Sequence, residues 1–150
     1  MTQRHAGFFL VALLASCPLP AAPPQYLNSP RAAGSLPFSE AVRVGDLLFL
    51  SGQIGVRPGT LSLVPGGLKA ETAQMMDNIK ATLADAGLGL DDLVKCTVML
   101  ADMAEWPAFN EVYRGYFPHH FPARSAFGAT GLALGARVEM ECIAATRRPD

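Results

Sequence analysis

Two charged side chains in the second half of the chain have types that suit anion binding and proton transfer. Arg124 carries a guanidinium, a rigid two-pronged donor that matches a carboxylate and keeps its charge at any relevant pH. Glu139 carries a carboxylate, which exchanges protons near neutral pH once partial burial has raised its pKa. Each residue also has a plainer interpretation. Arg124 can be a surface arginine that ends a loop, and Glu139 can be solvated or paired beside Arg137 and Glu141.

The elements that would position these residues follow from periodicity and turn signals. Apolar residues recur at helical spacing in two segments, and β-branched or alternating segments mark the strands. The expected order is strands at 38–44 and 47–52, a helix at 69–86, a strand at 93–100, a helix that starts near Ala104, and strands at 124–130 and 136–146. This order indicates an α+β fold: a single sheet of five to six strands with two helices on one face.

One predicted strand is apolar on both of its faces. In residues 47–50, Leu47 and Phe49 point to one side, and Leu48 and Leu50 point to the other. Two helices cover only one side of such a sheet, and a chain of this size has no third layer. We therefore expect the other side to be buried against copies of the same chain, in a homo-oligomer.

Composition narrows the classes of function. The chain has 150 residues, of which 50% are apolar and 17% are charged, as expected for one globular domain. Its 12 basic and 13 acidic residues give no general attraction to nucleic acid or to an anionic membrane. Three cysteines are too few for a small fold held together by disulfides.

The first residues have the pattern of a secretory signal. A basic start precedes an unbroken apolar run at 8–15, which is far shorter than the roughly 20 residues that span a bilayer. Residues 14–17, Leu-Ala-Ser-Cys, resemble the lipobox of bacterial lipoproteins, in which the cysteine, here Cys17, carries the lipid. Ordinary cleavage after Ala21 is the alternative, and it would leave a soluble secreted protein.

We therefore divide the chain into three parts. Residues 1–17 are a signal peptide with lipobox, residues 18–36 a proline-rich tether, and residues 37–150 the folded domain. The expected location is the periplasm, with attachment to the membrane only through a lipid on Cys17 or, if cleavage follows Ala21, with no attachment.

Several stretches together resemble one known family over residues 37–147. They are PFSEAVRVGD at 37–46, LSGQIG at 50–55, ET at 71–72 with NI at 78–79, VKCTV at 94–98, FNEVY at 109–113, FPARS at 121–125, VEME at 138–141 and IA at 143–144. This ordered set is similar to the RidA/YjgF family of reactive intermediate deaminases. The resemblance implies a fold like a bacterial type of chorismate mutase, and homotrimers with clefts between subunits.

The resemblance also implies a reaction. Members of the family hydrolyse enamines and imines of 2-oxo acids, such as 2-aminoacrylate, to the 2-oxo acid and ammonia, as 2-iminobutanoate/2-iminopropanoate deaminases do. They use no metal and no organic cofactor. The expected partners of this chain are thus a small carboxylate-bearing substrate and two copies of itself, with no nucleic acid.

The matching positions carry the family's roles over to this chain. Arg124 would grip the substrate carboxylate, and Glu139 would position the attacking water and pass a proton to the leaving nitrogen. The remaining positions that would line the cleft are Asn110, Ser51 and Gly52, with the backbone N–H groups of Ser125 and Ala126 as donors to the reacting atoms.

Two positions depart from the family pattern. Phe38 stands where a tyrosine is usual, and Ala126 stands where a cysteine is common. Both changes make the expected pocket wall more apolar, which favours a larger or more hydrophobic substrate side chain.

A second function remains open, because the usual substrate arises in the cytoplasm and this chain is expected to leave it. The alternative is a non-catalytic envelope oligomer that binds a small carboxylate ligand or acts as a chaperone. Cys96 and Cys142 lie in strands and are expected to be small buried residues. A disulfide between them is open, since sequence does not show how closely their Cα atoms approach. The neighbours His119 and His120 are interpreted as a solvated loop pair.

Overall fold

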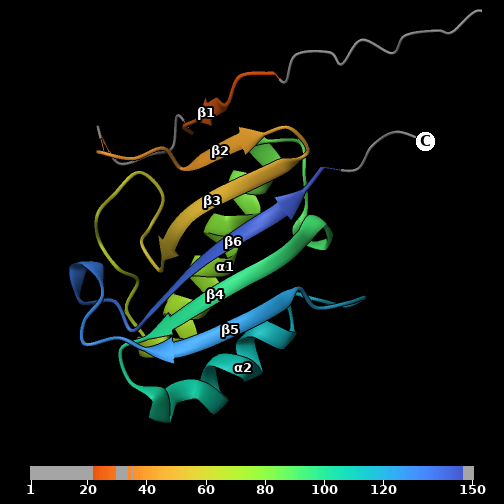
Figure 1. Cartoon of the computed structure of the whole chain (residues 1–150). Coiled ribbons are helices and arrows are strands. Elements are labelled where there is room, and N and C mark those ends of the chain that lie inside the picture. Colours follow the sequence, from red (N-terminus) through yellow and green to blue (C-terminus); the bar gives the residue numbers. More distant parts are fainter. Residues whose placement is uncertain (1–21, 30–33, 35, 147–150) are drawn as a thin grey trace, which may run out of the picture.

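A computed structural model describes residues 22–29, 34 and 36–146. These residues form one six-stranded sheet with the strand order β1-β2-β3-β6-β4-β5 (Figure 1). Neighbouring strands are antiparallel, apart from β4 and β5, which run parallel. The strands are β1 (Gln25–Leu27), β2 (Ala41–Val44), β3 (Leu47–Ile54), β4 (Leu93–Leu100), β5 (Ala123–Gly128) and β6 (Val138–Ala145).

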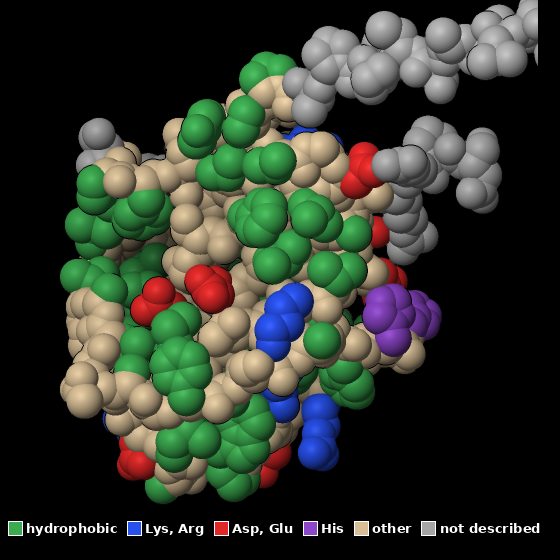
Figure 2. All heavy atoms as spheres, viewed as in Figure 1, with side chains coloured by type: hydrophobic (Ala, Val, Ile, Leu, Met, Phe, Trp, Pro, Cys, Tyr) green, Lys and Arg blue, Asp and Glu red, His purple; other side chains and the backbone are tan. Residues whose placement is uncertain are grey.

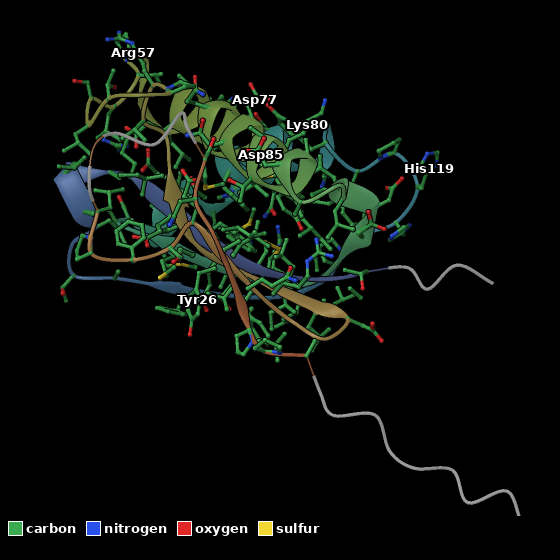
Figure 3. The ribbon with its side chains drawn as sticks, turned by 90° about the horizontal axis from the view of Figure 1, so that it is seen from above. Tyr26, Arg57, Asp77, Lys80, Asp85 and His119 are labelled. Atoms are coloured by element: carbon green, nitrogen blue, oxygen red, sulfur yellow. A yellow bond between two sulfur atoms is a disulfide. The ribbon has the colours of Figure 1, made fainter. Side chains whose placement is uncertain are left out.

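Two helices, α1 (Gly67–Asp85) and α2 (Trp106–Arg114), pack on one side of the sheet in the part of the chain that is described. Seen from above, Asp77, Lys80 and Asp85 lie on the side of α1 that faces away from the sheet, and Tyr26 of β1 lies on the opposite side of the molecule (Figure 3). Short 3-10 turns occur at η1 (Leu90–Asp92), η2 (Met103–Glu105) and η3 (Ala133–Gly135). The α+β fold expected from the sequence is confirmed.

The predicted helix near Ala104 begins in two steps. The turn η2 comes first, and the side chain of Asp102 accepts a hydrogen bond from the backbone N–H of Ala104 at 2.8 Å. The helix α2 follows, with Pro107 in its first turn. Proline is tolerated there because the first backbone N–H groups of a helix have no partner within the helix.

The strand β1 lies in the segment predicted to be a tether. Gln25–Leu27 pairs antiparallel with β2, with Tyr26 opposite Val42. The sheet therefore begins before the predicted domain boundary at residue 37. An extended segment pairs readily with the open edge of a sheet, and proline content alone does not reveal this pairing.

The core lies between the sheet and α1. Along β6, the side chains of Val138, Met140, Cys142 and Ala144 are buried, as the alternation of residues predicts. They face the buried residues of α1, which include Met75, Met76, Ile79 and Leu83. Burying one such side chain fully contributes roughly 1.5–3 kcal/mol, so this layer stabilises the sheet that carries the candidate site.

A disulfide joins Cys96 of β4 to Cys142 of β6 on the helix side of the sheet. The two residues are directly opposite each other in the antiparallel register, and their Cα atoms are 4.1 Å apart. Both side chains are buried. The bond that the sequence left open is thus present, and it links the two central strands covalently.

The other side of the sheet is not covered by a helix. Leu47 and Phe49 on this side are 40% and 41% exposed, whereas Leu48 and Leu50 are buried beneath α1. Figure 2 shows this side, where apolar side chains occupy much of the surface and a few charged side chains lie among them. None of the described helices is long and apolar enough to cross a membrane.

Candidate active site

The side chain of Arg124 extends from the edge strand β5 towards α2. Its Cζ atom lies 4.5 Å from the ring centre of Trp106 and 4.4 Å from the ring centre of Tyr113. Its Nη2 donates a hydrogen bond to Oδ1 of Asn110 at 2.9 Å. Attraction between the cation and the aromatic faces, together with this bond, holds the guanidinium in one orientation.

Two polar atoms in this cluster are buried without a hydrogen-bond partner among the described residues. They are Nη1 of Arg124 and the hydroxyl oxygen of Tyr113. Burial raises the pKa of the Tyr113 hydroxyl, and the nearby charge of Arg124 opposes that shift only in part, so the hydroxyl keeps its proton at neutral pH. Both atoms can therefore donate, and a carboxylate would satisfy both of them.

A cavity of about 390 Å³ opens beside this cluster. Its lining includes Trp106, Asn110, Tyr113, Phe121, Pro122 and Arg124. We call it the arginine cavity. Of the sequence-predicted site residues, Arg124 and Asn110 lie here and contact each other.

Glu139 lies on β6 and points to the uncovered side of the sheet, next to β3. Burial raises the pKa of its carboxyl group, and the neighbouring charge of Glu141 raises it further. The register of β3 and β6 shifts between Leu50 and Gln53, and Gly52 lies at this irregularity. A Cβ atom added to Gly52 would overlap Oε1 of Glu139, so only glycine permits this close approach.

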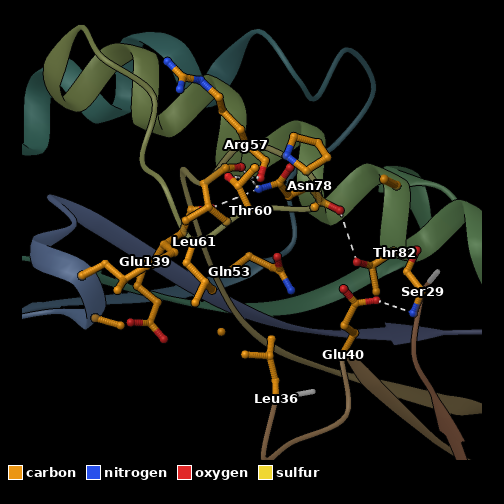
Figure 4. A pocket seen from close by; sticks show the side chains of 18 of the residues that line it. Ser29, Leu36, Glu40, Gln53, Arg57, Thr60, Leu61, Asn78, Thr82 and Glu139 are labelled. Carbon is orange, nitrogen blue, oxygen red and sulfur yellow. Dashed lines mark hydrogen bonds between the residues drawn. The ribbon is translucent and has the colours of Figure 1, made fainter. Parts of the chain in front are cut away.

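A second cavity, of about 420 Å³, adjoins Glu139. It is bounded by β3, α1 and the loop between them, with η3 completing the wall beside Glu139 (Figure 4). We call it the glutamate cavity. Of the predicted site residues, Phe38, Gly52 and Glu139 line it. The Ser51 hydroxyl instead donates to the carbonyl oxygen of Ser39 at 2.7 Å.

The side chains of Arg124 and Glu139 point to opposite sides of the sheet. Arg124 is opposite Cys96, whose side chain is buried on the helix side, whereas Glu139 alternates with Val138 and Met140 and so faces the other way. Within the described residues, the lining of one cavity shares no residue with the lining of the other. One copy of the chain therefore does not bring Arg124 and Glu139 together.

A family model described as "Endoribonuclease L-PSP" matches residues 27–146. The chain belongs to this family, the L-PSP or RidA/YjgF family. It is 44% identical over 117 residues to a 2-iminobutanoate/2-iminopropanoate deaminase of Capra hircus, which covers 78% of this chain and 84% of the relative. It is 42% identical over 117 residues to a RutC family protein of Pyrococcus horikoshii, covering 78% and 91%.

Solved structures of RidA-family proteins have the same fold. The crystal structure of RidA from an Antarctic Psychrobacter has a TM-score of 0.76 and 36% identity to this chain, covering 81% of this chain and 98% of that one. The crystal structure of E. coli TdcF with bound serine also has a TM-score of 0.76, at 31% identity, and covers 82% and 99%.

The remaining predicted site residues of this RidA-family chain lie apart from both cavities. The Ser125 hydroxyl accepts a hydrogen bond from Nζ of Lys95 at 2.7 Å, on the side of the sheet opposite Arg124. Ala126 is partly buried against the core. Phe38 and Ala126, which were expected to form one apolar wall, are therefore separated in a single copy. Cys17, the expected lipidation site, lies outside the described residues.

The sequence did not point to two aromatic residues of the candidate site, which were assigned only to the apolar face of a helix. Trp106 and Tyr113 are seven positions apart on α2, with Asn110 between them, and they enclose Arg124. The polar groups of Tyr113 and Asn110 on an otherwise apolar helix face are the feature of the sequence that could have indicated a binding site here.

The described residues contain no group of three or more histidine, cysteine or acidic side chains that could hold a metal ion. His119 lies in the loop after α2 (Figure 3), and Nε2 of His120 is 3.1 Å from the backbone carbonyl oxygen of Asp91. This pair of histidines thus does not contribute to either cavity.

Proposed function

We propose that the chain is a hydrolase that deaminates reactive imines and enamines of 2-oxo acids. The observation that carries the proposal is Nη1 of the partly buried Arg124, which has no partner among the described residues, together with the Tyr113 hydroxyl in the same cavity. Such a pair of donors suits a planar carboxylate. Relatives named 2-iminobutanoate/2-iminopropanoate deaminase support the reaction, and the serine bound to TdcF supports a small carboxylate ligand.

The reaction needs one water molecule and three proton transfers. Glu139, as the ionised carboxylate, accepts a proton from water while the water oxygen attacks the carbon of the protonated imine, which gives a neutral carbinolamine. The carbinolamine takes that proton back from Glu139 on its nitrogen, its C–N bond breaks and ammonia leaves, and Glu139 accepts the hydroxyl proton as the C=O bond of the 2-oxo acid forms. The raised pKa of Glu139 makes it a better base near neutral pH than an ordinary carboxylate.

A complete site is proposed to form between copies in a homotrimer. Arg124 of one copy and Glu139 of the next would then face one substrate. The separation of the two cavities within one chain supports this arrangement, because each cavity has only one of the two charged groups. The exposed side chains of Leu47 and Phe49 give the uncovered side of the sheet a surface that association would bury.

The test uses imines generated in situ and two variants of Arg124. Arg124→Ala removes the donors, and Arg124→Lys keeps the charge without the fork. We expect Arg124→Ala to lower kcat/KM by about a hundredfold, since each charge-assisted hydrogen bond contributes roughly 1.5–3 kcal/mol, and we expect Arg124→Lys to recover only part of that loss. Full activity of Arg124→Ala, or no acceleration of any imine by the wild type, would refute the proposal.

The name of the family model refers to an endoribonuclease. The near balance of 12 basic and 13 acidic residues gives this chain no general attraction for RNA. The imine reaction is therefore the function that we propose.

We further propose that the chain is exported, and the buried Cys96–Cys142 disulfide supports this location. Disulfides persist in oxidising compartments and are rare in the cytosol. Peptide mapping of protein from the periplasm or membrane should find the two cysteines linked, and a pair of free thiols would contradict export. If Cys17 carries a lipid, Cys17→Ala should move the protein from the membrane to the soluble fraction.

A further inference from the structure

The glutamate cavity is larger than the smallest imines require. Its volume of about 420 Å³ falls in the range of about 300–1,000 Å³ that holds drug-sized ligands, whereas the simplest 2-imino acids have a side chain of one carbon. Large apolar side chains dominate its lining: Leu36, Phe38, Ile54, Val56, Leu61 and Leu134. The cavity therefore has room for an apolar group next to Glu139.

Most polar side chains around this cavity already have partners within the protein. The amide nitrogen of Asn78 donates to two backbone carbonyl oxygens at 3.1 and 2.9 Å, and the Thr82 hydroxyl donates to the carbonyl oxygen of Asn78 at 3.2 Å. Oε2 of Glu40 accepts a backbone N–H at 2.7 Å, and the guanidinium of Arg57 points away from the cavity (Figure 4). Apart from Glu139 and the amide of Gln53, the described wall offers mainly apolar contact.

Leu134, in η3, is held in a backbone conformation that leucine rarely adopts. It is the one non-glycine residue among those described with a positive φ, which is 57°. Its side chain is 55% exposed, so burial in the core of the chain does not explain its type. Glycine or asparagine would adopt this conformation with less strain. Strained residues of this kind concentrate at ligand sites.

We infer that the glutamate cavity holds the side chain of a large apolar 2-imino acid, with Leu134, Leu61 and Phe38 enclosing it. This inference rests on the proposed function, and it names the substrate class: imines of the leucine or phenylalanine type in preference to those of the alanine type. All three residues line the cavity and are at least half exposed, so they are available for contact with a ligand. The apolar substrate side chain thereby lies beside Glu139, where the imine carbon must meet water.

The test replaces Leu134 by residues that suit its backbone. Leu134→Asn and Leu134→Gly remove the apolar contact and relieve the strain. We expect kcat/KM for the imines of leucine and phenylalanine to fall about tenfold, as for the loss of an apolar contact in a specificity pocket, while the value for the alanine imine changes little. We also expect the melting temperature to stay level or rise.

Leu132→Asn is the matched control, since Leu132 lies in the same segment but does not line the cavity. It should leave the preference among the three imines unchanged. A structural role for Leu134 would instead lower the melting temperature and reduce all rates equally. That result would overturn the inference, as would dissociation of the oligomer in Leu134→Asn, because the side chain would then be an interface contact.

Binding of the product 2-oxo acids separates this inference from the proposed function. Calorimetric titration of the full folded chain with 4-methyl-2-oxopentanoate, phenylpyruvate and pyruvate should give tighter binding of the first two, and Leu134→Asn should reduce that difference. If the wild type hydrolyses no imine but keeps this preference, the proposed reaction fails and the pocket assignment stands. If pyruvate binds as tightly as the others, or alanine imine is the best substrate, the pocket assignment fails whatever the reaction.

Discussion

The surroundings of the charged group differ between the arginine cavity and the glutamate cavity: those of Arg124 stabilise its charge, and those of Glu139 disfavour its charge. Two aromatic rings and Asn110 hold the guanidinium of Arg124, and its Nη1 has no hydrogen-bond partner among the described residues, which favours an anionic ligand. Glu139 instead lies partly buried near another acid, so that its ionised form is disfavoured. The first cavity is thus suited to bind a fixed charge and the second to exchange a proton. The groups that we propose for binding and for proton transfer thus point to opposite sides of one sheet.

A disulfide connects the part of the sheet next to Arg124 with the strand that carries Glu139. The Cys96–Cys142 disulfide joins β4, which pairs with the strand of Arg124, to β6, which carries Glu139. The disulfide is buried in the core and restricts the movement of β4 and β6 relative to each other. The site that we propose between two copies would depend on such a rigid sheet, because small displacements of reacting groups lower the rate strongly.

The largest effect on activity is expected from Glu139→Gln, which tests whether Glu139 is the group that transfers the proton. The amide keeps the shape but accepts no proton at neutral pH, so kcat should fall about 10²–10⁴-fold with little change in KM. Steady-state kinetics on the preferred imine checks this. A rise in KM with unchanged kcat would assign Glu139 to substrate binding and would contradict its role in proton transfer.

Glu141→Gln is the matched control, since Glu141 lies on the same face of β6. Its charge is the second cause of the raised pKa of Glu139, so its removal should lower that pKa. The acid limb of the kcat profile should then move to lower pH while the plateau rate stays near that of the wild type. A limb that does not move would mean that another group controls it.

Gly52→Ala should have the next largest effect, because the new Cβ would overlap Oε1 of Glu139. Displacing the carboxylate by about 1 Å is expected to lower kcat about 10²-fold. Binding of a 2-oxo acid through Arg124 should persist. Gly89→Ala is the control, since no atom lies within 4 Å of a Cβ added there. Equal activity of the two variants would show that the close approach does not matter.

Tyr113→Phe should have a smaller effect, confined to the arginine cavity. Loss of one neutral donor to the carboxylate, which contributes about 0.5–1.5 kcal/mol, should raise KM roughly two- to tenfold with kcat nearly constant. Stability should not fall, because the hydroxyl is buried without a partner among the described residues. Thermal unfolding of the variant checks this second point, and a large drop in melting temperature would indicate a structural bond instead.

The smallest expected effect is on the pH dependence of the free energy of unfolding. The folded-state pKa of Glu139 is raised, so the native chain binds more protons than the unfolded chain as the pH rises past the ordinary pKa of glutamate. Wild-type stability should decline across that interval and level off above the folded-state pKa. Glu139→Gln should remove this decline, which makes the variant the more stable protein at neutral pH but not at low pH. Melting curves at both pH values test the sign.

Local patterns in the sequence determined the elements and the faces of the central strands. The alternation in residues 138–144 depends only on the two-residue period of a strand, and it predicted which side chains of β6 are buried. The doubly apolar segment at 47–50 likewise predicted an uncovered apolar face. The types of Arg124 and Glu139 limited the chemistry that each can perform.

Tertiary structure decided how these parts meet. The pairing of β1, the disulfide, the aromatic enclosure of Arg124 and the strained Leu134 all join residues through register and packing. Those features depend on contacts between segments far apart in the chain, which no local pattern encodes. Strand register and packing also place the side chains of Arg124 and Glu139 on opposite sides of the sheet. Side-chain type is a property of each residue alone, whereas the direction in which a strand presents it depends on the neighbours that the whole fold supplies.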